Sequence, residues 1–381
     1  MEYMAKNIPL WQITTWDKNF NNVDKEWQPK TIKYKYLLSD ELDSLRVDDG
    51  DIRILYTGKD VGYTTEELAG DNISEGEVVS IPWGGIPTVK YHKGKFVTGD
   101  NRIATSNDTS KLTNKYLYYY LQGNIGEIAS YYRGASLKHP CMKDVLKMTI
   151  SYPSVQEQEK ICSQFDMLEW LIEARKQELQ LLDDLIKARF VEMFGDSASN
   201  EKGWKMNTFG DICTVRQGLQ IPISKRLTEY EEDSYEYITV QYLHGGKEKE
   251  YIKSPKESVK CTKDDILMTR TGNTGMVVTN VEGVFHNNFF LIDFDRERFE
   301  KDFLVEYLNL DLIQADITRR AGTSTIPDLN HGEFYKIKVF EPPIDLQKEF
   351  DEFKMQVDKS KLMFQKLHQK LNILQKKAGD I

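Results

Sequence analysis

The sequence has 381 residues, which is enough for two or three domains of about 150 residues each. Hydrophobic residues make up 40% and charged residues 29% of the chain, which excludes global disorder and a collagen-like protein. The 4 cysteines show no short pairing, which excludes a disulfide framework and a cysteine-based zinc cluster. No apolar run reaches the roughly 18 residues of a spanning helix, and no signal peptide is visible, so we expect a cytoplasmic protein without a membrane partner.

One basic segment stands out against an acidic background. Residues 90–147 hold ten Lys or Arg and four Asp or Glu, whereas the whole chain has a net charge of −9. Tyrosines lie among these cations, and this mixture suits a surface that faces phosphates. The alternative is a solvated face over a tyrosine-rich core.

Short runs rich in Val, Ile, Phe and Thr, bounded by Gly or Asn, predict the strands. In chain order they cover residues 77–81, 96–98, 237–240, 265–269, 275–279 and 289–294. Helical spacing predicts short helices over 114–122 and 303–313. The predicted fold class is α+β, with two tandem mixed α/β domains.

The chain repeats itself at an offset of about 188 residues. Glu77-Val78-Val79 ahead of Gly84 matches Asp265-Ile266-Leu267 ahead of Gly272. Pro153 and Gln158 match Pro342 and Gln347 in the same order. This period is too long for a solenoid and indicates two copies of one unit, with the first domain over 1–152 and the second over 196–341.

Each copy ends in a long helix with a heptad stripe, predicted over 153–195 and 342–381. Prolines mark both starts, and Gly195 and Gly379 mark the ends. We predict that the two stripes pack on each other as an antiparallel coiled coil; the alternative is that each packs on its own domain. The predicted helix-pairing residues are Ile161, Phe165, Leu168, Ile172, Leu179, Leu182, Ile186, Phe350, Phe353, Val357, Phe364, Leu367, Leu371 and Leu374.

The chain lacks the sequence motifs of the enzymes considered. It has no P-loop, no dinucleotide fingerprint, no Asp/Asn-Pro-Pro-aromatic tetrapeptide and no histidines at metal-ligand spacing. A nuclease-like set of Asp328, Glu352 and Lys354 is discounted because Phe353 lies on the heptad stripe. We therefore expect no catalytic residue and no metal site in this chain.

The two proline motifs carry a resemblance to a known family. Pro153-Ser154-Val155-Gln156-Glu157-Gln158 and its heptad helix closely resemble the first helical spacer of type I restriction-modification specificity subunits. The motif returns as Pro342-Pro343-Ile344-Asp345-Leu346-Gln347, with Leu346 where Glu is more usual. The resemblance covers the whole chain. One departure is Ile81-Pro82-Trp83-Gly84-Gly85, which stands where the second copy has an Arg-Thr-Gly loop.

The resemblance implies a non-catalytic subunit that gives a type I restriction-modification complex its DNA sequence specificity. Each domain would read one half of a split, asymmetric target in double-stranded DNA, and the helices would set the gap and dock two modification (methyltransferase) subunits. Restriction (translocase and endonuclease) subunits would complete the complex. S-adenosylmethionine, ATP and Mg are expected on these partners and no cofactor on this chain. The alternatives are a protein-interaction scaffold and the recognition part of a bifunctional restriction enzyme.

Base reading requires donors and acceptors on loops, with Arg and Lys suited to guanine and Asn and Gln to adenine. In the first domain the predicted base contacts are Trp83, Asn101, Arg102, Arg133, Ser136 and Lys138. The predicted phosphate contacts are Lys90, Lys93, Lys95 and Lys143. In the second domain the predicted contacts are Arg270, Thr271, Asn273, Thr274, Asn287, Asn288, Arg319, Arg320, Thr323 and Ser324. For each of these residues the alternative is an ordinary turn or surface charge.

Overall fold

The structure, a computed structural model, describes residues 5–18, 31–58, 61–243, 245, 248–323 and 327–379, with side chains from residue 7 to residue 366 within these ranges. The chain divides into two units, Met1–Lys176 with Lys366–Ile381, and Gln177–Gln365. Ser324 and the side chains of Leu367, Leu371 and Leu374 lie outside the described residues. No helix within the described ranges is long and apolar enough to cross a membrane.

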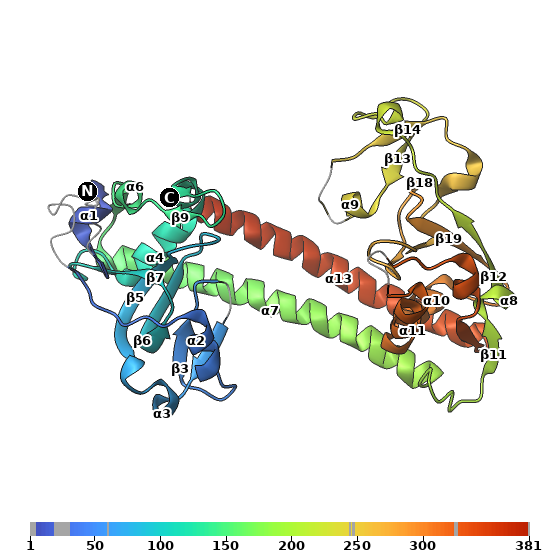
Figure 1. The fold of residues 1–381 in the computed structure, drawn as a ribbon, viewed down its shortest axis with the longest axis horizontal. Helices are drawn as coiled ribbons and strands as arrows, with labels where there is room; N and C mark the ends of the chain where they lie inside the picture. The colour runs from blue at the N-terminus through green and yellow to red at the C-terminus, as the bar shows by residue number, and fades with distance from the viewer. Residues whose placement is uncertain are drawn as a thin grey trace. The chain divides into compact units, whose positions relative to one another are not determined.

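The first unit contains a six-stranded sheet in the order β2-β7-β5-β6-β3-β4 (Figure 1). Neighbouring strands are antiparallel except for the parallel pair β3 and β6. From Val78 to Pro82, β5 is buried on both faces, which explains an apolar run interrupted only by Ser80. The strands are β2 (Thr14–Trp16), β3 (Ile52–Leu55), β4 (Val61–Thr64), β5 (Ser74–Pro82), β6 (Lys90–Thr98) and β7 (Asn101–Ser106).

Helix α4 covers the middle of this sheet, where Leu117 and Leu121 share a core with Val79 and Ile81 of β5. An antiparallel pair, β1 with β10, joins the start of the domain to its end. The remaining elements are β1 (Ala5–Pro9), β8 (Tyr132–Arg133), β9 (His139–Pro140), β10 (Thr149–Tyr152), α1 (Leu10–Ile13), α2 (Ser39–Leu45), α3 (Glu66–Ala69), η2 (Gly70–Asn72), α4 (Asn114–Gly123), α5 (Ile125–Ser130) and α6 (Met142–Val145).

The second unit holds two four-stranded sheets, β12-β19-β16-β17 and β14-β13-β18-β15. Alternate residues of β16 face opposite cores: Ile266 packs with Phe303 of α10, whereas Leu267 packs with Ile238 and Phe285 of the other sheet. The strands are β11 (Lys205–Thr208), β12 (Cys213–Gln217), β13 (Ser234–Ile238), β14 (Tyr251–Lys253), β15 (Lys260–Cys261), β16 (Ile266–Thr269), β17 (Val277–Val278), β18 (Gly283–Phe285), β19 (Phe289–Phe294) and β20 (Lys338–Glu341). The helices are α8 (Phe209–Ile212), η3 (Ile223–Lys225), α9 (Val240–Leu243), η4 (Glu257–Val259), α10 (Lys301–Asn309), α11 (Asp311–Ala321) and α12 (His331–Tyr335).

The second unit repeats the framework of the first. The pair β11 and β20 corresponds to β1 and β10, and α10 and α11 correspond to α4 and α5. Several predicted elements were wrong in detail. The strand expected over 96–98 is the end of β6, which begins at Lys90, and the strand expected over 275–279 covers only Val277–Val278. The helix expected over 303–313 is two helices, because Leu310 takes an extended conformation (φ −62°, ψ 137°) between them. The strand expected to run to Val240 ends at Ile238, and Val240 begins α9.

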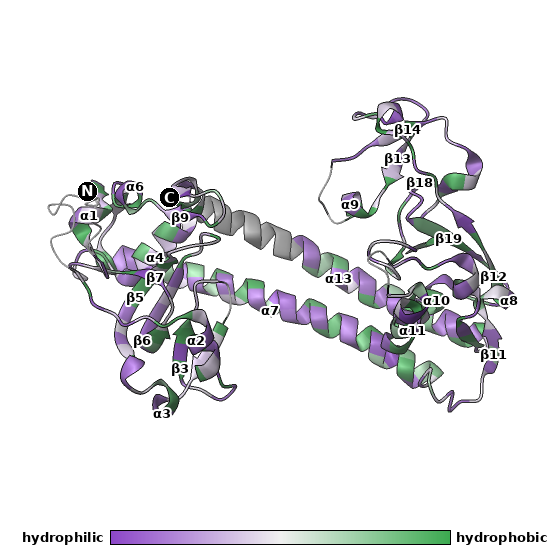
Figure 2. Ribbon diagram, in the orientation of Figure 1, coloured by the Kyte–Doolittle hydropathy of each residue, from purple (hydrophilic) through white to green (hydrophobic). Residues whose placement is uncertain are grey.

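The two long helices are α7 (Val155–Phe194) and α13 (Ile344–Gly379). Along α7, hydrophobic residues recur among hydrophilic ones (Figure 2). In the second unit the two helices run antiparallel, since Asp183 pairs with Lys361 (2.6 Å) while Arg189 pairs with Glu349 (3.0 Å). Five residues predicted to pair the helices lie in or against the core of that unit, namely Leu182, Ile186, Phe350, Phe353 and Val357.

The first half of α7 packs on the first domain. Phe165 stacks on Tyr119 of α4 with ring centroids 4.6 Å apart, and Ile161 packs against the same core. For these two residues the contacts agree with the alternative of a helix packed on its own domain. Ile172 is buried, and the other predicted pairing residues with described side chains are half-buried, namely Leu168, Leu179 and Phe364.

Candidate nucleic-acid interface

Three loops meet at the end of β5 in the first unit. We name them loop A1 (83–89, after β5), loop B1 (99–100, before β7) and loop C1 (134–138, between β8 and β9). The backbone N–H of Trp83 donates to the carbonyl of Asp100 (2.9 Å), and that of Gly85 donates to the carbonyl of Lys138 (3.1 Å). These bonds join A1 to both of the other loops, so residues far apart in the sequence form one surface.

Two side chains, Arg102 and His139, contact Trp83 at the start of loop A1. The guanidinium of Arg102 lies 4.3 Å from the ring centroid of Trp83, and His139 lies 5.4 Å from Trp83 on centroids. Arg102 is only 1% exposed and forms ion pairs with Asp17 (3.2 Å) and Asp100. Burial raises the pKa of Asp17, and the charge of Arg102 opposes this shift. Arg102 therefore positions Trp83 and its guanidinium is not presented to solvent.

Asn101 is also buried, although the sequence predicted a base contact. Its amide donates to the carbonyl of Leu55 (2.8 Å) and to the hydroxyl of Thr98 (3.1 Å). Asn101 and Arg102 follow loop B1 at the start of a central strand, where a side chain reaches the interior of the sheet. In this conformation neither side chain presents its polar group to a DNA groove.

The other residues predicted for the first domain are at the surface. Arg133, Ser136 and Lys138 are exposed on or beside loop C1, and Arg133 pairs with Asp144 (2.9 Å). Of the predicted phosphate contacts, Lys90, Lys93 and Lys95 each have a carbonyl or carboxylate partner. Lys93 pairs with Glu77 (3.7 Å), Lys95 pairs with Glu66 (3.1 Å), Lys90 donates to the carbonyl of Tyr56, and Lys143 is exposed on α6.

The second unit builds the same three-loop arrangement. Loop A2 (270–276) follows β16, loop B2 (286–288) precedes β19, and loop C2 (322–323 and 327–330) precedes α12. The N–H of Arg270 donates to the carbonyl of Asn288 (2.7 Å), and the N–H of Leu329 donates to the carbonyl of Arg270 (2.9 Å). Loop A2 is thus joined to B2 and C2 as A1 is joined to B1 and C1.

Arg270 is held in place by an acid that the sequence did not assign to it. Its Nε and Nη2 donate to the two carboxylate oxygens of Asp328 at 2.9 and 2.7 Å. Thr271 forms a β-bridge to Asp328, and the hydroxyl of Thr274 donates to the carbonyls of Arg270 and Pro327. Among the described residues Nη1 of Arg270 has no hydrogen-bond partner, so the paired guanidinium retains donors for a base edge.

The remaining residues predicted for the second domain divide into two places. Asn273 and Thr323 are exposed on loops A2 and C2, while Asn287 and Asn288 are half-buried on B2. Arg319 and Arg320 instead pair with Asp316 at the end of α11. They line a cavity of about 590 Å³ with residues of α11, β11 and β20, and Arg320 also pairs with Glu333 of α12 (3.2 Å).

A buried glutamine attaches each long helix to its own domain. In the first unit the amide of Gln158 donates to the carbonyls of Pro153 (2.9 Å) and Lys111 (2.6 Å), and its oxygen accepts from the N–H of Thr113 (2.9 Å). In the second unit Gln347 makes the same three bonds, to Pro342 (2.9 Å), Arg298 (3.0 Å) and the N–H of Glu300 (2.9 Å). The recurring Pro and Gln of the sequence are therefore one structural device, used twice.

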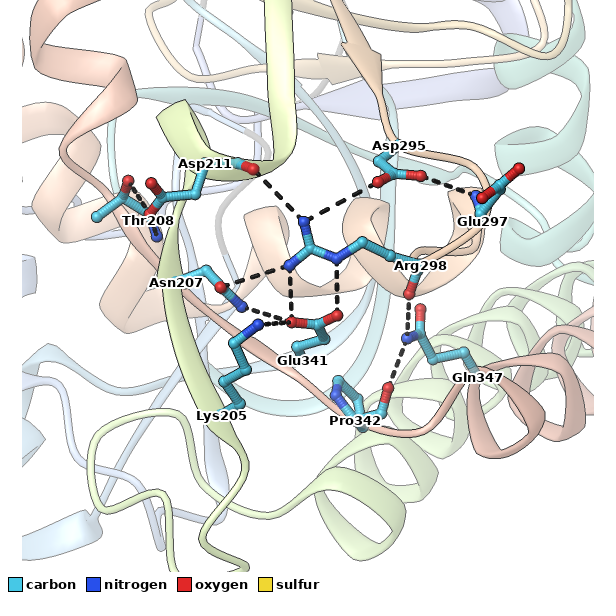
Figure 3. A network of polar contacts seen from close by, with 10 residues as sticks. All are labelled: Lys205, Asn207, Thr208, Asp211, Asp295, Glu297, Arg298, Glu341, Pro342 and Gln347. Atoms are coloured by element: carbon cyan, nitrogen blue, oxygen red, sulfur yellow. Dashed lines mark hydrogen bonds and ion pairs between the residues drawn. The ribbon is translucent and has the colours of Figure 1, made fainter.

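Arg298 extends this attachment in the second unit (Figure 3). Its Nε and Nη2 each lie 2.8 Å from a carboxylate oxygen of Glu341, at the end of β20. This pairing lowers the pKa of Glu341 to about 2. Asn207 of β11 also donates to Glu341 (2.9 Å). The guanidinium of Arg298 thus holds the end of β20, while its backbone carbonyl accepts the bond from Gln347 of α13.

Side-chain pairs next to these glutamines have opposite polarity in the two units. In the first, Lys115 of α4 pairs with Asp166 of α7 (2.7 Å). In the second, Lys354 of α13 pairs with Asp302 (3.1 Å) and Glu306 (3.2 Å) of α10. The cation lies on the domain in one unit and on the long helix in the other.

Comparison with known proteins is consistent with this duplicated arrangement. The chain matches the family described as "Type I restriction modification DNA specificity domain" twice, over residues 31–183 and 201–373. It is 28% identical over 155 residues to the type I restriction enzyme MjaIX specificity subunit of Methanocaldococcus jannaschii, covering 35% of each chain. It is 22% identical over 161 residues to the MjaVIII specificity subunit of the same organism, covering 42% of this chain and 36% of that protein. These matches span little more than a third of either relative's length.

Two solved structures share the fold. The S subunit of a type I restriction-modification system from M. genitalium superposes with a TM-score of 0.63 at 16% identity, over 99% of this chain and 95% of that one. A second structure, from work on complex assembly and conformational transition of the type I R-M system, has a TM-score of 0.55 at 14% identity, over 99% and 98%. At these identities the likeness concerns the fold alone.

Proposed function

The chain belongs to the type I restriction-modification specificity subunits, and from this premise we propose that each three-loop cluster reads one half of a bipartite, asymmetric sequence in double-stranded DNA. The observation that carries the proposal is that the two units share one arrangement of three loops, while the side chains on those loops differ. Loops A1 and C1 present Trp83, Ser136 and Lys138, whereas A2 presents Arg270 and Asn273. Since each base pair offers its own pattern of donors and acceptors in the major groove, different loop residues select different half-sites.

The long helices are the proposed docking surface for two modification subunits and the spacer that sets the gap between half-sites. In the first unit α7 leaves Met167 and Trp170 exposed, Trp170 by 68%. In the second unit Leu181 of α7 and Leu362 and Met363 of α13 are exposed. Large apolar side chains in water on a helix favour a protein partner.

We assign recognition to this chain and chemistry to its partners. In the proposed complex the modification subunits bind S-adenosylmethionine and methylate adenine. Restriction subunits use ATP and Mg to translocate and cleave DNA. The acidic net charge of −9 fits a chain that encloses DNA together with these subunits and does not grip phosphates alone.

Mapping methylated adenines in cells that carry this chain and its modification subunits tests the proposal. We expect a motif of two defined halves with an undefined gap. Lys138→Ala should relax the half read by the first domain, and Asn273→Ala should relax the other half, since one lost base contact costs about 1–3 kcal/mol of discrimination. The untouched half of each motif is the internal control. Equal relaxation of both halves, or no sequence preference, would contradict separate readers.

A further inference from the structure

Two aliphatic side chains project into solvent from the loops of the first unit. Ile86 on loop A1 is 73% exposed, and Leu137 on loop C1 is 56% exposed. The two loops are joined by the hydrogen bond from Gly85 to Lys138, and a Cβ built on Gly84 would lie 3.2 Å from Leu137. We call Ile86 and Leu137 the apolar tip. A single exposed aliphatic residue is ordinary, but two on loops that are bonded together indicate a contact surface.

The loops under the apolar tip are held rigidly. Trp83 contacts both Arg102 and His139, and the ring of His139 also hydrogen-bonds to the carbonyl of Trp83 (2.7 Å). Gly85 has φ +93°, a left-handed conformation that glycine adopts without strain. The tip is therefore presented in a fixed shape before any partner arrives, so little ordering is required on contact.

The charges around the tip favour a polyanion. Lys138 follows Leu137 directly and is exposed, Arg133 at the end of β8 directly precedes the same loop, and residues 131–143 contain no Asp or Glu. Asp144, beyond that stretch, pairs with Arg133 (2.9 Å). An apolar patch framed by cations matches the major groove at a thymine, where a 5-methyl group stands between phosphate-lined walls. The second unit has polar residues, Thr271 and Asn273, on the corresponding loop.

We propose that Ile86 and Leu137 contact the 5-methyl group of a thymine in the half-site read by the first domain, and that this contact helps to specify that base. The proposal rests on the proposed function. It adds two residues that specify a base through apolar contact and not through hydrogen bonds. It also requires the first half-site to contain at least one thymine.

The experiment uses the complex of the full chain with its modification subunits and duplexes of its own target. Each thymine of the first half-site is replaced in turn by deoxyuridine, which removes only the methyl group. For the wild-type chain, one replacement should weaken binding about fourfold, as expected for one buried carbon. For the Ile86→Ala, Leu137→Ala double variant the same replacement should have no effect, because the methyl group has already lost its contact. Leu68→Ala, an exposed aliphatic residue on α3, is the matched control and should behave as wild type.

Each other result has one meaning. Equal deoxyuridine effects in the wild type and the double variant, or a first half-site without thymine, overturn the proposal. A double variant that binds target DNA normally but fails to hold its modification subunits shows that the tip is a protein contact, which also overturns it. Unchanged reading of the second half-site verifies that the variant is folded. A wild-type complex with no bipartite preference defeats the proposed function itself and is thereby distinguished from failure of the tip.

Discussion

The two junctions between a long helix and its domain share the same glutamine bonds but differ in the polarity of a neighbouring ion pair. Gln158 and Gln347 make the same three bonds, and all of these bonds go to backbone atoms. The neighbouring ion pairs have reversed charge, Lys115 with Asp166 in one unit and Asp302 with Lys354 in the other. A bond to the backbone does not depend on the identity of the partner residue, so it survives divergence between copies. A side-chain pair can exchange its signs without loss, provided both members change.

The largest effect should follow from removing the glutamine. Gln347→Leu leaves two carbonyls and one N–H without partners in a buried place, which should cost about 2–4 kcal/mol of unfolding free energy. Gln158→Leu should cost a similar amount in the first unit. Urea denaturation, followed by hydrogen exchange to assign the loss to a unit, measures both. Gln156→Leu and Gln356→Leu replace exposed glutamines on the same helices and are the matched controls. Similar losses in variant and control would show that helix propensity, not the buried bonds, is responsible.

The sequence revealed these glutamines but not their role. The repeat placed Pro153 with Gln158 and Pro342 with Gln347 in register, and the prolines gave the starts of α7 and α13 within two residues. The atoms that Gln347 contacts belong to Arg298 and Glu300, 49 and 47 residues earlier. A bond to a backbone atom does not constrain which residue carries that atom, so the sequence cannot reveal the partner. The sequence therefore identifies the motif, and only the fold explains its role.

The candidate site was predictable to the level of loops. Most of the selected residues do lie on or beside three loops that the fold brings together. Asn101 and Arg102 follow loop B1 but are buried, and this was not predictable because their partners, such as Asp17, are too far away in the sequence to be recognised. The residues that lie away from the loops are Arg319 and Arg320 on α11, Lys93 and Lys95 on β6, and Lys143 on α6. The apolar tip was missed for the opposite reason: Ile86 and Leu137 look like core residues in a sequence, and only their exposure distinguishes them.

The two reversed ion pairs should differ in how much they stabilise their units. Lys354 is 11% exposed and faces two carboxylates that are mostly buried, whereas Lys115 is 34% exposed. Lys354→Met should therefore destabilise the second unit by about 1–3 kcal/mol, because it leaves Asp302 and Glu306 without their cation. Lys115→Met should cost less than about 1 kcal/mol.

Rescue separates charge from packing in this comparison. If unpaired charge is the cause, Lys354→Met combined with Asp302→Asn and Glu306→Gln should recover most of the lost stability in the same urea titrations. A triple variant no more stable than Lys354→Met alone would instead mean that the lysine stem, packed along α10, provides the stabilisation.

The smallest expected effect depends on pH and arises next to the same lysine. Burial, with the nearby charges of Asp302 and Glu300, raises the pKa of Asp351 to about 7, against the opposing charges of Lys354 and Lys301. The folded chain thus holds a proton on Asp351 between about pH 4 and pH 7 that the unfolded chain has released, so stability falls as pH rises through this window. Asp351→Asn keeps the shape of the side chain and removes the free-energy cost of ionising a half-buried carboxylate in the folded chain. Its melting temperature should exceed that of the wild type by roughly 2–4 °C at pH 8, allowing for partial exposure of the carboxylate, and the gap should close towards pH 5. Glu352→Gln, an exposed carboxylate on the next residue, is the control. A pH-independent gap for Asp351→Asn would show that Asp351 holds no extra proton in the folded chain and would contradict its raised pKa.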